Sequence, residues 1–198
     1  MAGRLALSSV STSSTPRVQQ PQAGSLKRMP ASPVVGLVFD AWEDLDRVLD
    51  GLSVEDAVRQ VDGGSSFAWT LGHLANQLDT WINVRVQQRT PHPLFASERW
   101  RMGGSGAADE WNAVRSASDQ IRVVARAFLD TLDDVALAAE SPYAGTLRAL
   151  QGRNVSLRYT LQRIATHTYF HIGEIASVRS RRLSQQVGDY PGPLLACL

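Results

Sequence analysis

Residues 156–183 read SLRYTLQRIATHTYFHIGEIASVRSRRL. Apolar positions recur in this stretch every three or four residues, which is the period of an amphipathic helix with one buried face. The residues of that face are Leu157, Leu161, Ile164, Thr168, Ile172 and Ile175. The pattern predicts a helix from about Ser156 to Leu183.

Two further segments carry the same helical period. The first runs from about Pro33 to Leu52, and Ser53 with Asp56 has the form of a cap that begins one extra turn. The other is expected to begin with Asp109 as its cap. Its predicted seam consists of Trp111, Val114, Ser118, Ile121, Ala125, Phe128, Leu132 and Val135.

A fourth helix is predicted in the middle of the chain. Ser65 or Ser66 caps its start after a pair of glycines, and it is expected to run to about Arg89, before two prolines. Residues 90–108 and 138–155 are rich in glycine and proline and are expected to be long connections, with a short extended piece but no convincing strand pair. Four amphipathic helices with such connections predict an all-α four-helix bundle over residues 33–193, not necessarily in simple up-down order.

Residues 1–32 differ from the rest of the chain in composition. They are rich in Ser, Pro, Gln and Gly, contain four basic residues and no acid, and lack apolar periodicity, so we expect a disordered tail. An organelle transit peptide has a similar composition. A flexible tail, or a start codon upstream of the natural one, explains the segment more simply.

Charge and cysteine content narrow the class of protein. The net charge is +1, and without the four cations of residues 1–32 the remainder carries about −3, so a nucleic-acid partner is not expected. No apolar run approaches the roughly 18 residues of a membrane span. The single cysteine, Cys197, excludes an internal disulfide and fits a reducing compartment. We therefore expect a cytoplasmic protein, with organelle targeting as the alternative.

Three of the four histidines lie on inward-tending helical positions. His167 and His171 are four residues apart, which places both rings on one face of a helix, and His73 lies on the apolar side of the second predicted helix. Three neutral imidazoles can hold one divalent metal ion and leave a position open. On spacing alone, packed and hydrogen-bonded histidines remain the alternative. His92 lies between two prolines and is expected to face solvent.

Each histidine ligand needs a hydrogen-bond partner that fixes its tautomer. Glu174, Asn76, Asp79 or a backbone carbonyl are the partners that the sequence offers, and the sequence does not choose among them.

Two segments resemble the metal-binding helices of the DinB/YfiT-like superfamily. One is SFAWTLGHLA at residues 66–75, followed by Asp79 and Trp81; the other is HTYFHIGEI at residues 167–175, followed by Arg179. The resemblance implies a four-helix fold with a metal site at His73, His167 and His171, occupied by zinc or nickel. It also implies relatives that are S-transferases using bacillithiol or mycothiol. In the related mycothiol-dependent maleylpyruvate isomerase, a glutamate takes the position of His167, so this chain departs from that pattern.

The leading functional hypothesis is a metal-dependent transferase that uses a low-molecular-weight thiol and a small-molecule acceptor; no residue is assigned a catalytic role. Trp69, Trp81 and Trp100 could line an acceptor pocket, although core packing is the simpler interpretation. One alternative is a metal-binding stress or interaction protein without catalysis. Another is metal-assisted hydrolysis with Glu174 as base, although we favour a supporting role for Glu174. Dimerisation through a face of the bundle stays open.

Overall fold

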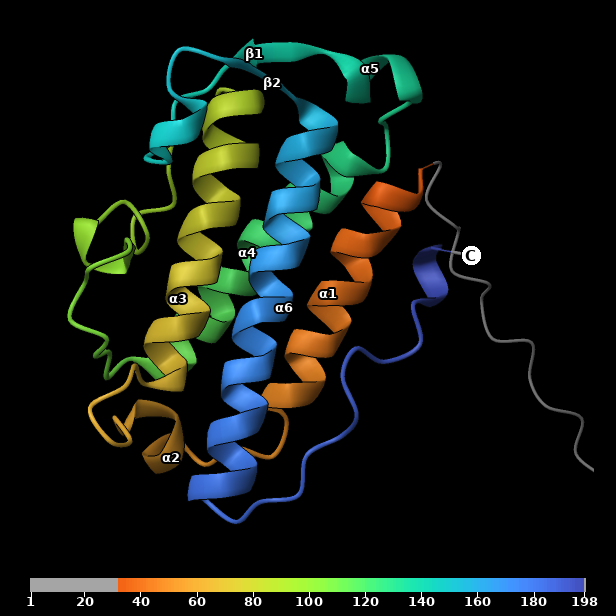
Figure 1. The fold of residues 1–198 in the computed structure, drawn as a ribbon. Coiled ribbons are helices and arrows are strands. Elements are labelled where there is room, and N and C mark those ends of the chain that lie inside the picture. Colours follow the sequence, from red (N-terminus) through yellow and green to blue (C-terminus); the bar gives the residue numbers. More distant parts are fainter. Residues whose placement is uncertain (1–31, 198) are drawn as a thin grey trace, which may run out of the picture.

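The computed structural model describes residues 32–197, which form an all-α bundle of four long helices (Figure 1). These helices are α1 (Pro33–Leu49), α3 (Phe67–Leu78) with its π-helical continuation η1 (Asp79–Val86), α4 (Trp111–Leu129) and α6 (Leu157–Arg182). α1 and α6 run in one direction and α3 and α4 in the other, with α6 between α3 and α1 and with α4 behind them. The predicted four-helix bundle is confirmed, and its order is not simple up-down-up-down.

Serine side chains cap the first turn of three of the helices, and two of these caps, at Ser53 and Ser66, were predicted from the sequence. The Oγ atoms of Ser53, Ser66 and Ser156 each accept a hydrogen bond from the backbone N–H three residues later. Ser53 begins the short helix α2 (Val54–Val58). The predicted cap at Asp109 is wrong: Glu110 occupies that position without a side-chain cap, because its carboxylate binds the guanidinium of Arg99 at 2.6 Å.

The predicted ends of α1 and α4 are too late. α1 ends at Leu49, because Gly51 has a φ of +68° and turns the chain away. α4 ends at Leu129, and Val135, predicted to lie in its seam, is 80% exposed. Asp133 explains the second difference: its side chain accepts from the N–H of Ala136 and begins a new helix, α5 (Asp134–Ala138).

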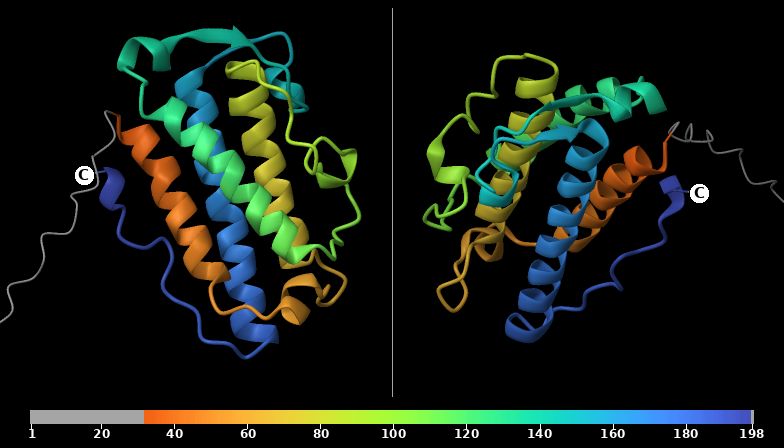
Figure 2. Two further views of the ribbon diagram at one scale, coloured as in Figure 1. Left: turned by 180° about the vertical axis from the view of Figure 1, so that it is seen from behind. Right: turned by 45° about the horizontal axis from the view of Figure 1, so that its top comes forward.

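A two-stranded antiparallel sheet joins α5 to α6, which corrects the expectation of no strand pair. β1 (Glu140–Pro142) pairs with β2 (Asn154–Ser156), and Ser141 lies opposite Val155. Strands of three residues are too short to show a period of two in the sequence. The pair lies across the upper ends of α3 and α6 (Figures 1 and 2).

The second predicted helix changes its winding after Leu78 and ends at Val86 rather than Arg89. In η1 the hydrogen bonds span five residues, as in the bond from the N–H of Gln87 to the carbonyl of Ile82. The buried Asp79 accepts from the side chain of Asn83 and from the backbone N–H of His92. This polar network attaches the long loop to the helix.

The chain after α6 packs back along α1. The backbone N–H of Gly192 donates to Asp44, and that of Ala196 donates to Asp40, so two buried carboxylates of α1 hold this segment. It ends in a short helical turn, η4 (Leu195–Cys197), which lies beside α1. The predicted tail lies outside the described residues, apart from Ser32, the buried residue that precedes α1.

Within residues 32–197, no helix has both the length and the apolar composition that crossing a membrane requires.

The long loop between η1 and α4 packs through Trp100 against the backbone of α3. Trp100 belongs to a short helical turn, η2 (Glu98–Trp100), is fully buried, and donates from its indole N–H to the carbonyl of Leu94 at 2.6 Å. A Cβ atom added at Gly72 would overlap the six-membered ring of Trp100. Gly72 therefore lets the indole lie directly on the helix, and the core-packing interpretation of Trp100 and of the buried Trp69 is confirmed.

Alanine at the two mid-helix glycines should have opposite effects on the free energy of unfolding. Gly173 on α6 has open space around it, so Gly173→Ala should raise that free energy by roughly 0.5–1 kcal/mol. Gly72→Ala should lower it by about 1–3 kcal/mol, because Trp100 cannot yield without disturbing the core. Urea unfolding of both variants measures this. Equal stabilisation by both substitutions would contradict the packing described for Trp100.

Candidate metal centre

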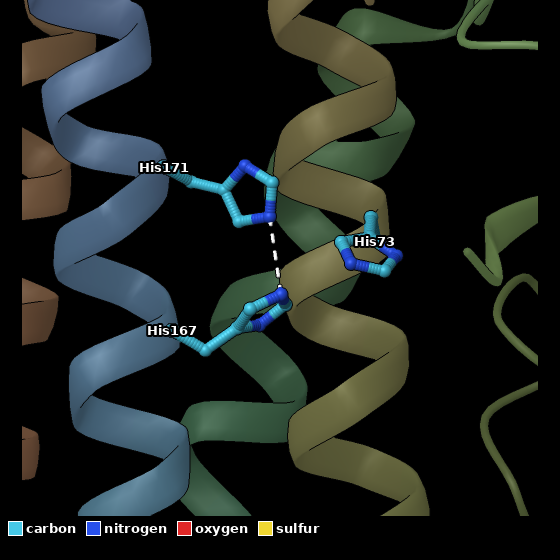
Figure 3. A group of neighbouring side chains, drawn as sticks. All are labelled: His73, His167 and His171. Carbon is cyan, nitrogen blue, oxygen red and sulfur yellow. Dashed lines mark hydrogen bonds between the residues drawn. The ribbon is translucent and has the colours of Figure 1, made fainter. Parts of the chain in front are cut away.

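The fold brings together the three histidines that the sequence singles out. His73 projects from α3, and His167 and His171 project from successive turns of α6, so that the three rings face one another across the gap between the helices (Figure 3). One nitrogen atom from each ring lies within 4.8 Å of the other two. The Nε2 atoms of His167 and His171 are 3.2 Å apart. This spacing suits three ligands that converge on a single ion.

Each of the three rings is held through its Nδ1 atom by a different oxygen. Nδ1 of His73 lies 2.6 Å from the backbone carbonyl of Trp100, and Nδ1 of His167 lies 2.8 Å from Oε1 of Gln77. Nδ1 of His171 lies 2.7 Å from the carboxylate of Glu174. Because all three partners are acceptors, each Nδ1 carries the proton and donates it, which leaves the lone pair on Nε2.

The fixed tautomers make the group a good cation site. With both Nδ1 atoms protonated, the Nε2 atoms of His167 and His171 are two acceptors facing each other at 3.2 Å, and no proton of a neutral ring lies between them. A divalent cation bound to both lone pairs removes this repulsion. Neutral imidazoles with a second hydrogen bond at Nδ1 are the usual ligands of such ions, so the donor set fits zinc or nickel.

Burial keeps the three rings neutral, and repulsion from neighbouring rings adds to its effect on the pKa of His167 and His171. Burial is the largest cause that lowers the pKa of His167 to about 3, and the neighbouring His171 and His73 add to it. The pKa of His171 is lowered to about 4, first by burial and then by the nearby ring of His73. The pKa of His73 is also lowered, mainly by burial. All three rings are therefore neutral at pH 7, with a proton on Nδ1 and a free lone pair on Nε2, which is the form that binds a metal without first releasing a proton.

The ring partners were predicted in part. Glu174 and a backbone carbonyl serve as the sequence suggests, whereas Asn76 donates to the carbonyl of Phe95 and Asp79 holds the loop. Gln77 was missed, although its position one helical turn after His73 places both on one face of α3.

His92 stands apart from the three-histidine group. It was expected to face solvent but is half-buried: its Nδ1 accepts from the N–H of Leu94, and its ring lies against Phe95.

A cavity of about 750 Å³ adjoins the histidines. His73 and His167 form part of its wall, together with residues of η1, the first half of α6, the 98–104 loop and the 143–147 connection. The rings of Trp81 and Tyr143 stack at 5.6 Å with an interplanar angle of 27°, forming one flat side. Of the tryptophans considered for a pocket lining, Trp81 alone lines this cavity. A cavity of this size accommodates a drug-sized molecule.

Bundle and site together define a class: four-helix proteins in which two helices present a three-histidine group beside a cavity. A family model of the DinB superfamily matches residues 40–175, which contain all three histidines. The chain belongs to the DinB superfamily. No curated protein and no solved structure matches it.

The geometry predicts about one divalent ion per chain, lost when a ring is removed. His171→Ala deletes one of the two facing Nε2 atoms and should reduce the bound metal severalfold or more in elemental analysis of protein purified without a histidine tag. His92→Ala is the matched control and should retain the wild-type content, because His92 lies outside the group. Equal metal in wild type and His171→Ala, or none in either, would contradict the site.

Proposed function

We propose that the chain holds one divalent metal ion, zinc or nickel, through His73, His167 and His171, and that it is an enzyme acting on a small molecule in the adjoining cavity. The observation that carries this proposal is the convergence of three neutral imidazoles, two of which, His73 and His167, line a cavity of about 750 Å³. A purely structural metal site is closed by its protein ligands, whereas three histidines leave a position for another molecule.

Within that class, transfer of a low-molecular-weight thiol to an electrophilic acceptor is the reaction we favour. A bound divalent ion supplies a Lewis acid that favours the deprotonated form of a thiol at neutral pH. The chain holds the three rings through Trp100, Gln77 and Glu174 and provides an apolar wall for the acceptor. In the transfer, the thiol gives its proton to solvent water, its sulfur forms a bond to the acceptor's electrophilic atom, and the leaving group departs with the electron pair of the broken bond.

Two alternatives have less support. Hydrolysis with Glu174 as the base is disfavoured, because the carboxylate of Glu174 binds Nδ1 of His171, on the opposite side of the ring from Nε2, and does not line the cavity. A metal-binding protein without catalysis would be favoured if the long loop filled the space beside the histidines. Residues 101–104 of that loop instead form part of the wall of the open cavity.

Thiol transfer is tested by product formation with purified full-length protein. Zinc- or nickel-loaded protein should form a thiol conjugate from bacillithiol or mycothiol and an electrophile such as a chlorodinitroarene, with mass spectrometry as the readout. His171→Ala should reduce the rate about a hundredfold or more, because the ion that activates the nucleophile is lost, whereas His92→Ala should react like wild type. Metal-loaded protein that forms no conjugate with any tested pair would overturn the transferase.

A further inference from the structure

The charged side chains that line the cavity are mostly positive, whereas the rest of the folded chain carries a net negative charge. The charged side chains that line it are Arg85, Arg101, Arg163 and Glu98, three cations against one anion. Outside the N-terminal residues 1–31, which hold four cations and no acid, the chain carries a formal charge of −3. A concave site of one sign attracts ligands of the opposite sign. The cavity therefore selects anions, although the body of the protein is acidic.

The three arginines differ in how far their donors are already used. Arg101 is paired with Glu98. Arg85 donates one N–H to the carbonyl of Ala144 at 2.7 Å, and its guanidinium lies 4.2 Å above the ring of Trp81, which leaves other donors free. Within residues 32–197, the guanidinium of Arg163 makes no hydrogen bond and no ion pair; only the backbone carbonyl of Arg163 accepts from a side chain, the hydroxyl of Thr166. Its guanidinium is the cavity's free anion-binding group.

Arg163 is also placed to position a ligand beside the histidines. It precedes His167 by four residues on α6, and both line the same cavity. Four residues of α-helix span about 6 Å along the axis. A molecule anchored at Arg163 therefore reaches the metal centre with a body of only a few atoms, and the stacked rings of Trp81 and Tyr143 provide a flat surface for that body.

We propose that the cavity binds a small organic acid, whose carboxylate is held by Arg163 with Arg85 as a second donor. Its apolar body lies beside the Trp81–Tyr143 pair, which lines the cavity, and extends toward the histidines. A planar carboxylate matches the two parallel N–H donors of a guanidinium. One free guanidinium suits a single negative charge better than a phosphate dianion. A small organic acid is thus the substrate class that we assign to the proposed enzyme. Its role as a substrate rests on the proposed function, whereas its binding at Arg163 needs no metal.

The test is ligand binding to the full-length protein, measured by calorimetry as purified and after chelation of metal. Benzoate should bind both forms at least about tenfold more tightly than benzamide, its uncharged isostere, and more tightly than phenyl phosphate. Arg163→Gln should lose at least about tenfold of the benzoate affinity while keeping its helical circular dichroism. Arg181→Gln is the matched control, because Arg181 is exposed on the same helix and does not line the cavity.

The proposal is overturned if benzoate and benzamide bind alike, if Arg163→Gln and Arg181→Gln behave alike, or if phenyl phosphate binds more tightly than benzoate. If the wild-type protein binds no metal but benzoate still binds through Arg163, the proposed metal-dependent function is wrong and the organic-acid site is kept. If the metal-loaded protein forms the thiol conjugate but does not bind benzoate, the proposed function is kept and the organic-acid site is wrong.

Discussion

The hydrogen bond from Nδ1–H of His73 to the carbonyl of Trp100, 2.6 Å long, joins the bundle to the long loop and the loop to the site. It exists because Trp100 is fully buried against α3, and that contact exists because residue 72 has no side chain. The Nδ1–H groups of His167 and His171 donate instead to side chains, Gln77 on α3 and Glu174 on α6. The central constraint is therefore the orientation of three imidazoles, each fixed from behind by an oxygen.

The packing of the helices sets the positions from which the three imidazoles meet. The antiparallel helices α3 and α6 lie side by side (Figure 1) and bring one histidine of α3 level with two of α6. The π-helical η1 continues α3 along the cavity, where Trp81 and Arg85 line the wall. The histidine group is polar and lies at the margin of the bundle rather than at its apolar centre. This position leaves it half-buried: dry enough to keep the rings neutral and open enough to meet a ligand.

Helical periodicity and i,i+4 spacing are local properties, so the sequence predicted the bundle and the placement of His167 and His171 on one helix face. Spacing alone left packed histidines as the alternative, and the resemblance of two segments to known metal-binding helices was needed to group His73 with that pair. The prediction failed where one local signal overrode another and where a role depends on the packing of distant segments. Val135 continues the apolar spacing of α4, but the cap at Asp133 ends that helix first. Gln77 carries no mark of its role until α6 is packed against α3. The charge of the cavity is likewise assembled from three separate elements, so no segment of the sequence reveals it.

Metal binding at this centre depends most directly on the tautomers of the three rings. Long-range nitrogen–proton correlation spectra of uniformly ¹⁵N-labelled protein distinguish an imidazole protonated at Nδ1 from one protonated at Nε2. We predict that, before metal is added, His73, His167 and His171 are protonated at Nδ1, and that zinc shifts their three Nε2 resonances together while leaving His92 unchanged. Protonation at Nε2 in any of the three, or zinc bound through an Nδ1 atom, would contradict this prediction.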